Sequence, residues 1–304
     1  MTDSLWDGKI VFEPRLRNCL MCSGFLCEDI EYKARWAEVE VRYVKCLRCG
    51  YLWQDPPMSR SSLMELYNNP TYWGMGDESY IYSDYLRQGK EYYKDSKRRL
   101  KMMKRVTQRE PGRVLEVGSG PGHSLKALAD EGIQCVGIDP SEVVNKFARE
   151  TYDLNCISTS IEDFRAQGQY DLVYSWGTSM NFVNPFVVYE KIYSLLTPGG
   201  IFFMDLFDVS SWFSILTSRK RKVGVHITCC PTKKGIESAH DRIGYAESGF
   251  MRFFPYYSVS FVGSILHAGW IKKLARCIDL RSVGLYAIVP GFYLFWARKA
   301  SADK

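Results

Sequence analysis

The stretch Val114-Leu-Glu-Val-Gly-Ser-Gly-Pro-Gly122 decides the fold. It begins in the apolar run Arg113–Val117, which predicts a short buried strand, and it ends in a turn that contains three glycines. The segment Leu125–Ala129 follows, with apolar residues at helical spacing. The order is therefore strand, glycine-rich turn and helix, an arrangement in which the backbone of the turn can approach a bound ligand closely.

The same alternation continues toward the C-terminus. Gln134–Ile138 predicts a second strand that ends in Asp139, and Val143–Ala148 predicts a second helix. Strands that alternate with helices predict an α/β fold with a parallel sheet and a ligand crevice at the carboxyl ends of the strands. The glycine-rich turn alone suits NAD, FAD and adenosyl ligands alike, so the rest of the chain has to decide the ligand.

Four segments in order resemble the motifs of class I S-adenosylmethionine (SAM)-dependent methyltransferases. Val114–Gly122 resembles the first motif and Val136–Asp139 the second-strand motif. Tyr170–Ser175 resembles the fourth-strand motif, and Leu195–Asp205, with its Thr-Pro-Gly-Gly turn, resembles the entry into the fifth strand. This resemblance covers roughly residues 95–300. It implies a Rossmann-like, seven-stranded, mostly parallel sheet with helices on both faces.

The C-terminal segments fit the same family. Ser258–Trp270 resembles its last helix, and Arg276–Val283 with Phe292–Arg298 resembles its closing antiparallel pair of strands. The alternative, a Rossmann domain of an oxidoreductase, would predict neither this hairpin nor the Thr-Pro-Gly-Gly turn. The resemblance therefore favours SAM as the cofactor and S-adenosylhomocysteine (SAH) as its product.

The resemblance also implies which residues hold the cofactor. It places Glu116, Gly118, Ser119 and Gly120 around the methionine part of SAM, and Asp139 on the ribose. A carboxylate suits the ribose because it can accept two hydrogen bonds from a cis-diol. An acidic side chain inside an apolar strand is expensive to bury without a partner, which favours a polar ligand contact at Glu116.

The adenine contacts depart from the family pattern. An acidic residue often follows the third strand near the adenine amino group, but Ser160 occupies that place here. Ile161 would then lie beside the adenine ring, and Glu162 is the alternative polar contact. Ser175 and Trp176 follow the fourth strand, and Trp176 borders either the adenosine or the acceptor, or belongs to the core.

Methyl transfer from a sulfonium is an in-line displacement, so the enzyme mainly positions the acceptor and excludes water. The Glu-His pair that family members often carry after the fourth strand is absent, although Asn181 could hydrogen-bond a substrate. His226 and His240 are the candidate general bases by residue type, with ordinary loop histidines as the alternative. Tyr72, in an aromatic segment upstream of the first motif, is a further catalytic candidate.

Four cysteines form two CxxC pairs near the N-terminus. Cys19 and Cys22 are separated by 23 residues from Cys46 and Cys49. This spacing predicts a four-cysteine zinc ribbon, against the alternatives of buried thiols or a redox pair. With four protein ligands Zn²⁺ has no open position, so we expect it to stabilise a small module. The arrangement resembles bacterial methyltransferases with an N-terminal zinc-binding region, often tied to sugar or secondary-metabolite biosynthesis.

We expect a zinc-ribbon module over residues 1–56, a helical linker over 57–110 and a methyltransferase domain over 111–304. Within the linker, Ser59–Tyr67 predicts a serine-capped helix. The basic segment Lys97–Arg105 is either a nucleic-acid stripe or a solvated helix whose apolar face packs on a sheet. An insert over about 207–252 is expected to choose the substrate.

The 304 residues are 46% hydrophobic and carry a formal charge of +6. The N-terminus lacks the apolar core of a signal peptide, and no uncharged run is long enough to span a bilayer. We therefore expect a cytoplasmic protein that acts on a small molecule, such as a sugar, a nucleotide-sugar or a secondary metabolite. A mildly basic chain permits a phosphate-bearing acceptor. The alternatives are an RNA methyltransferase and a non-catalytic SAM-binding protein, and the oligomeric state stays open.

Overall fold

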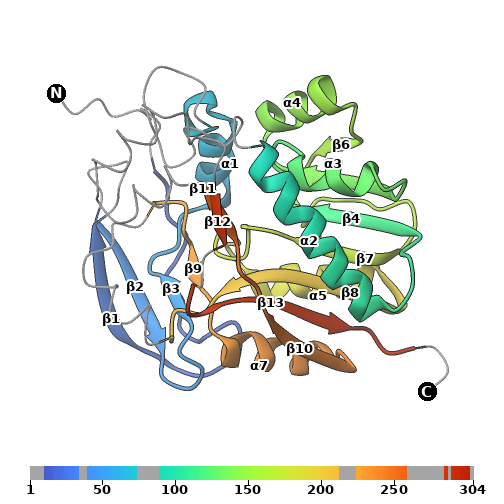
Figure 1. The fold of residues 1–304 in the computed structure, drawn as a ribbon. Coiled ribbons are helices and arrows are strands. Elements are labelled where there is room, and N and C mark those ends of the chain that lie inside the picture. Colours follow the sequence, from blue (N-terminus) through green and yellow to red (C-terminus); the bar gives the residue numbers. More distant parts are fainter. Residues whose placement is uncertain are drawn as a thin grey trace.

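The computed structural model describes residues 10–33, 40–73, 89–211, 224–258, 284–286 and 289–301. Its largest sheet has seven strands in the order β10-β13-β8-β7-β4-β5-β6 (Figure 1). Their bounds are β4 Arg113–Val117, β5 Gln134–Asp139, β6 Cys156–Ser158, β7 Tyr170–Ser175, β8 Leu196–Phe207, β10 Glu247–Arg252 and β13 Phe292–Arg298. The strands from β6 to β8 pair in parallel, and β13 pairs antiparallel with both β8 and β10. The expected mostly parallel α/β sheet is confirmed.

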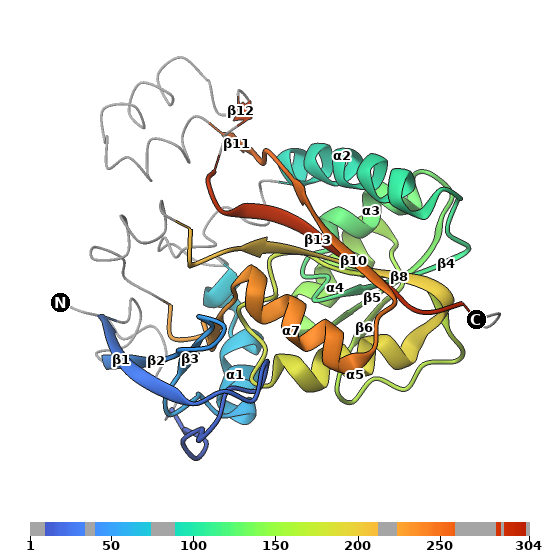
Figure 2. The same cartoon turned by 90° about the horizontal axis from the view of Figure 1, so that it is seen from below.

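Helices cover both faces of this sheet, because successive side chains of a strand point to opposite faces. The helices are α2 Gly89–Thr107, α3 His123–Ala129, α4 Glu142–Tyr152, α5 Pro185–Leu195 and α7 Lys233–Ile243. Val114 and Leu172 pack with Leu100 of α2 on one face. The next residues along the strands, Leu115 and Val173, belong to the core cluster that contains α5 and α7. Figure 2 shows α2 and α3 on one side of the sheet and α5 and α7 on the other.

The closing pair of strands differs from the expectation. Phe292–Arg298 is a strand, as expected, but its outer neighbour is Glu247–Arg252, which the sequence pattern assigns to the insert. The pattern predicts Arg276–Val283 in that place. This segment lies outside the described residues, as does the expected helix Ser258–Trp270 beyond its first residue. The error arises because both segments have a strand-like pattern, and only the long-range pairing distinguishes them.

A second sheet carries the cysteine module. Its order is β1-β2-β3-β9, all antiparallel, with β1 Leu26–Lys33, β2 Glu40–Cys46, β3 Leu52–Gln54 and β9 Cys229–Cys230. β9 comes from the chain after β8, so this sheet joins segments that are far apart in sequence. The division at residues 56 and 110 stays a prediction. A two-stranded sheet of β11 Tyr256–Ser258 and β12 Gly284–Tyr286 completes the described strands.

The linker contains the helix that its serine predicted. Ser59 caps α1, Arg60–Asn68, by accepting a hydrogen bond from the backbone N–H of Ser62. A 3-10 turn, η1 Pro70–Trp73, follows directly. None of the helices within the described ranges is long and apolar enough to cross a membrane.

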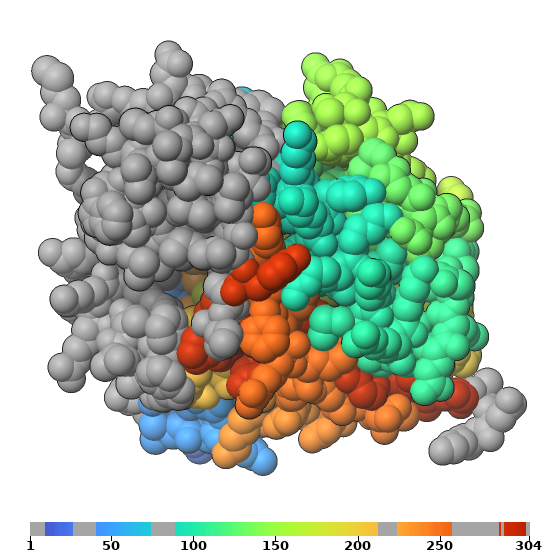
Figure 3. Space-filling view, in the orientation of Figure 1, coloured from blue at the N-terminus to red at the C-terminus, as the bar shows by residue number. Residues whose placement is uncertain are grey.

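The basic segment forms part of α2 and packs on the sheet. Leu100 and Met103 are buried against it. Its cations meet carboxylates, among them Lys97 with Glu131 at 2.5 Å. This arrangement confirms the solvated amphipathic helix. In the space-filling view of Figure 3, the side chains of α2 (teal) lie between the green residues that follow them in sequence and the orange and red ones.

Candidate functional site

A cavity of about 380 Å³ lies where the sequence predicts the crevice. Its lining comes from the residues that follow β4, β5, β6 and β7, together with α1, η1 and α2. Among the predicted cofactor residues it includes Glu116, Gly118, Ser119, Gly120, Asp139, Ser160, Ile161, Glu162 and Trp176. Four separate strand ends thus bring these residues to one place.

The glycine-rich turn needs its glycines. Gly118 and Gly120 have φ angles of 73° and 51°, in the left-handed region that other residues rarely adopt. A Cβ atom at Gly118 would lie 2.6 Å from the side chain of Thr178. The backbone N–H of Gly120 donates to Oδ2 of Asp139 at 3.0 Å. The turn is therefore packed closely against Thr178 and is hydrogen-bonded to the acidic residue of the next strand.

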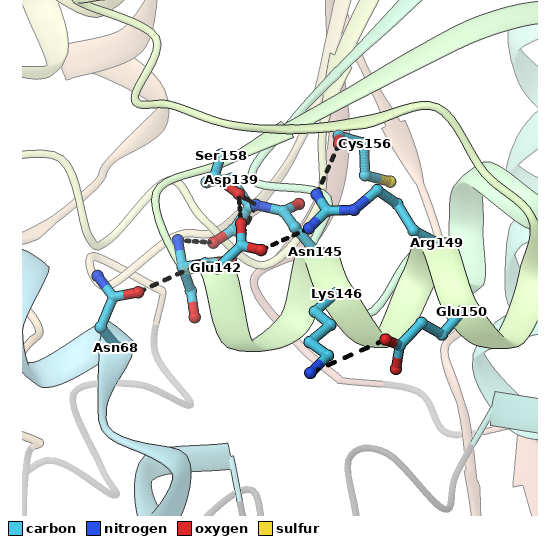
Figure 4. Close-up of polar contacts among 10 residues, drawn as sticks. Asn68, Asp139, Glu142, Asn145, Lys146, Arg149, Glu150, Cys156 and Ser158 are labelled. Atoms are coloured by element: carbon cyan, nitrogen blue, oxygen red, sulfur yellow. Dashed lines mark hydrogen bonds and ion pairs between the residues drawn. The ribbon is translucent and has the colours of Figure 1, made fainter.

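Asp139 is buried at the end of β5. Its other oxygen, Oδ1, accepts a hydrogen bond from the N–H of Ser141 at 2.9 Å. Burial raises the pKa of Asp139 to about 6, against the two backbone N–H groups, which lower it. Figure 4 shows Asn145 of α4 beneath this loop, where its amide donates to the backbone oxygens of Asp139 and Ser141, each at 2.8 Å. The carboxylate is thus held in one orientation toward the cavity.

Glu116 is the acidic residue inside β4. It is buried, and it accepts a hydrogen bond from the hydroxyl of Tyr174 at 3.0 Å. Burial raises the pKa of Glu116 to about 8, while Tyr174 and the charge of Arg99 lower it. A carboxyl group that carries a proton near neutral pH can give it up when a cation binds close by.

Arg99 and Asp205 are among the polar residues of the site that were not predicted. Arg99 reaches the cavity from α2, with its guanidinium 3.3 Å from Oδ2 of Asp205 and 4.6 Å above the ring of Trp176. Asp205, near the end of β8, also accepts the N–H of Gly177 at 2.8 Å, and burial raises its pKa. Arg99 stands four residues before the buried Met103, so helical spacing could have placed it on the inner face.

Two N–H groups of cavity-lining residues are buried and have no partner among the described residues. They are Nε of Arg99 and Nε1 of Trp176. Buried donors without an acceptor are costly, so they indicate a ligand that supplies one. Ser175 is buried but does not line the cavity, so its predicted contact has no structural support.

The catalytic candidates divide into two groups. Tyr72 and Asn181 line the cavity. His226 does not line it and lies behind Tyr72, with ring centroids 5.4 Å apart. His240 lies in α7 between Tyr189 and other aromatic rings, in the cluster on the far face of the sheet.

Burial lowers the pKa of both histidines to about 3. A group with so low a pKa is a poor proton acceptor at neutral pH. Since neither histidine lines the cavity either, the structure gives no support to His226 or His240 as general base, and that role stays a prediction. They were candidates because histidine often acts as a general base, but both side chains are buried outside the cavity lining.

The four predicted metal ligands come together away from the cavity. All are buried, and their sulfur atoms lie within 4.8 Å of one another. The Sγ atoms of Cys19 and Cys49 are 3.6 Å apart, and those of Cys22 and Cys46 are 3.4 Å apart. A tetrahedral zinc site separates its sulfurs by about 3.8 Å, whereas a disulfide joins them at about 2.05 Å. The donor set therefore fits Zn²⁺ and does not fit disulfides.

Comparisons with known proteins find similarity to methyltransferases. A ubiquinone biosynthesis O-methyltransferase of Vibrio parahaemolyticus is 35% identical over 102 residues, 31% of this chain and 43% of that protein. A malonyl-[acyl-carrier protein] O-methyltransferase of Ilyobacter polytropus is 27% identical over 111 residues, 34% of this chain and 41% of that protein. The chain thus spans less than half the length of these curated relatives.

Solved structures share the fold. A SAM-dependent methyltransferase of Thermotoga maritima superimposes with a TM-score of 0.52 at 13% identity, covering 78% of this chain and 99% of its own. The magnesium protoporphyrin IX methyltransferase of Synechocystis, solved with SAH, has a TM-score of 0.51 at 12% identity, with coverage of 80% and 100%. The family model described as a methyltransferase domain matches residues 85–261. The chain belongs to this methyltransferase family.

Proposed function

We propose that this protein transfers the methyl group of SAM to a small-molecule acceptor and releases SAH. The observation that carries the proposal is the convergence on one cavity of the glycine-rich turn, Glu116, Asp139 and Nε of Arg99, which has no partner within the described ranges. The names of the relatives support the reaction class, since both are O-methyltransferases.

Different parts of the lining suit different parts of SAM. Asp139 would accept both ribose hydroxyls, and the Ser160–Glu162 segment would border the adenine. The glycine-rich turn, with Gly118 and Gly120 in the cavity lining, would border the methionine part. The guanidinium of Arg99 suits the cofactor's carboxylate, because an arginine pairs with a carboxylate through two parallel N–H groups.

SAM supplies an activated methyl group on a sulfonium, and the protein supplies position. We propose that Asn181 and Tyr72, which line the cavity, orient the acceptor behind the methyl group. No base is required where the acceptor atom has no proton to lose or is already deprotonated. Where the acceptor must lose a proton, these two side chains are the described candidates for hydrogen bonding it.

The acceptor is proposed to be a small molecule with an apolar part. Aromatic side chains supply much of the lining outside the strand ends, namely Tyr67, Tyr72, Trp73, Tyr92, Phe182, Tyr256 and Phe292. Secondary metabolites and sugars that carry apolar groups fit such a surface. The mildly basic chain permits a phosphate-bearing acceptor, and the basic run Arg219–Lys222 of the insert could hold one, but this run lies outside the described residues.

RNA is the weaker alternative. It required the cations of α2 to be available for a phosphate backbone, but Arg98, Arg99 and Lys104 each lie within 3.3 Å of a carboxylate oxygen. Binding of RNA that weakens steeply as salt rises would revive it.

We also propose that the cysteine cluster holds a structural Zn²⁺. Cys19, Cys22, Cys46 and Cys49 would supply all four ligands, which leaves no position for a substrate. The metal would stabilise the β1-β2-β3-β9 module and take no part in methyl transfer.

The proposal is tested by calorimetry with SAM and SAH, followed by incubation with methyl-labelled SAM and pools of small-molecule acceptors. We expect micromolar binding of both compounds and transfer of label to an acceptor. Binding without transfer to any acceptor pool would support a non-catalytic SAM-binding protein. Absence of binding to either compound would refute the proposed function.

A further inference from the structure

The helix α1 and the turn η1 contact both loops that carry the predicted adenosine contacts. At the C-terminal end of α1, the carbonyl oxygen of Tyr67 accepts hydrogen bonds from the Ser141 hydroxyl at 2.6 Å and from the Trp73 indole at 2.7 Å. Ser141 is the residue whose N–H holds the carboxylate of Asp139. All of these residues are buried. The end of α1 therefore fixes the residue that orients the predicted ribose acceptor.

A second contact secures the same loop from outside. Oδ1 of Asn68, the last residue of α1, accepts the N–H of Glu142 at 2.9 Å, as Figure 4 shows. Glu142 is the first residue of α4, so Asn68 takes up one of the N–H groups that a helix leaves without a partner at its start. The loop from β5 to α4 is thus held by α1 at two neighbouring points.

The N-terminal end of α1 reaches the loop after β6. Arg60 donates to Oγ of Ser160 at 2.5 Å and forms an ion pair with Asp163. Ser160 stands where the family often has an acidic residue near the adenine. Arg60 and Ser160 both line the cavity. Arg60, which comes from another part of the chain, therefore bonds both Ser160 and Asp163 of this loop.

α1 is in turn built onto the cysteine module. The N–H of Ser59 donates to the carbonyl of Val11 at 2.8 Å, and the N–H of Val11 donates to Oγ of Ser62 at 2.9 Å. The apolar side of the helix packs in one cluster with β2 and β3, which contains Leu63, Leu66, Val41, Tyr43, Leu52 and Met58. The position of α1 therefore depends on this module.

We propose that Arg60 is a positioning residue for the adenosine half of the cofactor, and that α1 forms one wall of that subsite. This inference rests on the proposed function, since it assigns a role in SAM binding. The side chains of Arg60 and Asp163 are 41% and 62% exposed, so their ion pair adds little to folding. Loss of the pair should therefore change cofactor binding more than stability.

The test compares two ligands on three variants of the full chain. SAH has both the adenosine and the amino-acid part, whereas 5′-methylthioadenosine lacks the amino-acid part. Arg60→Met should weaken both ligands by the same factor of about ten, because the loop that borders the adenosine half loses the side chain that fixes it. Arg60→Lys, which keeps the charge, should recover part of this loss. Arg99→Met should weaken SAH and leave methylthioadenosine within about twofold, because that ligand lacks the carboxylate.

A matched control is Arg298→Met, which removes a half-buried arginine that lies outside the cavity and pairs with Glu247 at 3.2 Å. It should bind both ligands as the unaltered chain does. If Arg60→Met binds both ligands normally, or loses SAH alone, the inference is wrong while the proposed function stands. If the unaltered chain binds neither ligand, the proposed function itself fails.

Discussion

At the scale of single residues, Asp139 shows how the fold prepares a binding group. Two backbone N–H groups hold its oxygens, and burial keeps water away from them. A ligand hydroxyl therefore meets a carboxylate that needs no reorientation. The resemblance to the family's second-strand motif predicted this residue, because that motif can be recognised from neighbouring residues in the sequence.

Replacing Asp139 should test the predicted ribose contact. We expect Asp139→Ala to weaken SAH binding by about 1.5–3 kcal/mol, as hydrogen bonds to a charged group are lost. Calorimetry measures the change. Asp130→Ala, an exposed residue at the end of α3, serves as the control and should leave the affinity unchanged. If Asp139→Ala bound SAH as tightly as Asp130→Ala does, the assignment of Asp139 to the ribose would be wrong.

Glu116 should make stability depend on pH. Burial raises its pKa from 4.5 to about 8 in the folded chain, so the folded state binds a proton that the unfolded state releases in this range. The free energy of unfolding should therefore fall as pH rises from about 5 to 8. Urea titrations at several pH values should show a flatter dependence for Glu116→Gln. Parallel curves for the two proteins would show that Glu116 is not responsible.

At the scale of elements, α2 both packs on the sheet and supplies a side chain to the cavity. Its apolar side packs on the sheet through Leu100 and Met103, and Arg99 reaches the cavity beside them. The amphipathic pattern predicted the packing side. It did not predict the binding role, because whether a cation on the inner face of a helix meets a ligand depends on what lies opposite it.

The packing of α2 can be tested by truncation. Leu100 is 2% exposed, so Leu100→Ala should lower the free energy of unfolding by about 2–5 kcal/mol through loss of contacts and a cavity. The adjacent Lys101 is exposed, and Lys101→Ala should stay within about 0.5 kcal/mol. Denaturant unfolding followed by circular dichroism compares the two. Similar effects for both would contradict the helix register.

At the scale of the whole molecule, the cysteine module is part of the chain's central packing. Cys229 of β9 and Tyr51 of the module belong to the same core cluster as residues of α5 and α7. The hydroxyl of Thr232, which caps α7, donates to the carbonyl of Cys49 at 2.7 Å. Disturbing the metal site should therefore affect the whole protein.

Removal of the metal tests this connection. We expect a strong chelator to release about one Zn²⁺ per chain and to lower the melting temperature, since binding energy of a structural zinc is folding energy. It should also weaken SAH binding, because α1 joins the module to the adenosine loops. Metal analysis, differential scanning fluorimetry and calorimetry measure the three effects. An unchanged melting temperature with no zinc released would refute a metal in this cluster.

The local signals in the sequence were enough for the sheet, the glycine-rich turn, Asp139 and the four cysteines. Each depends on residues close in the chain: apolar periodicity, glycines in a tight turn, an acid at a strand end, and CxxC spacing. Arg60, Arg99 and Asp205 join the site from elements up to about 145 residues apart, the separation between Arg60 and Asp205. The pairing of β10 with β13 and the burial of His226 and His240 also depend on contacts between residues that are far apart in the sequence. Only packing in three dimensions determines which side chains meet and which lose contact with water, and local spacing carries no record of either.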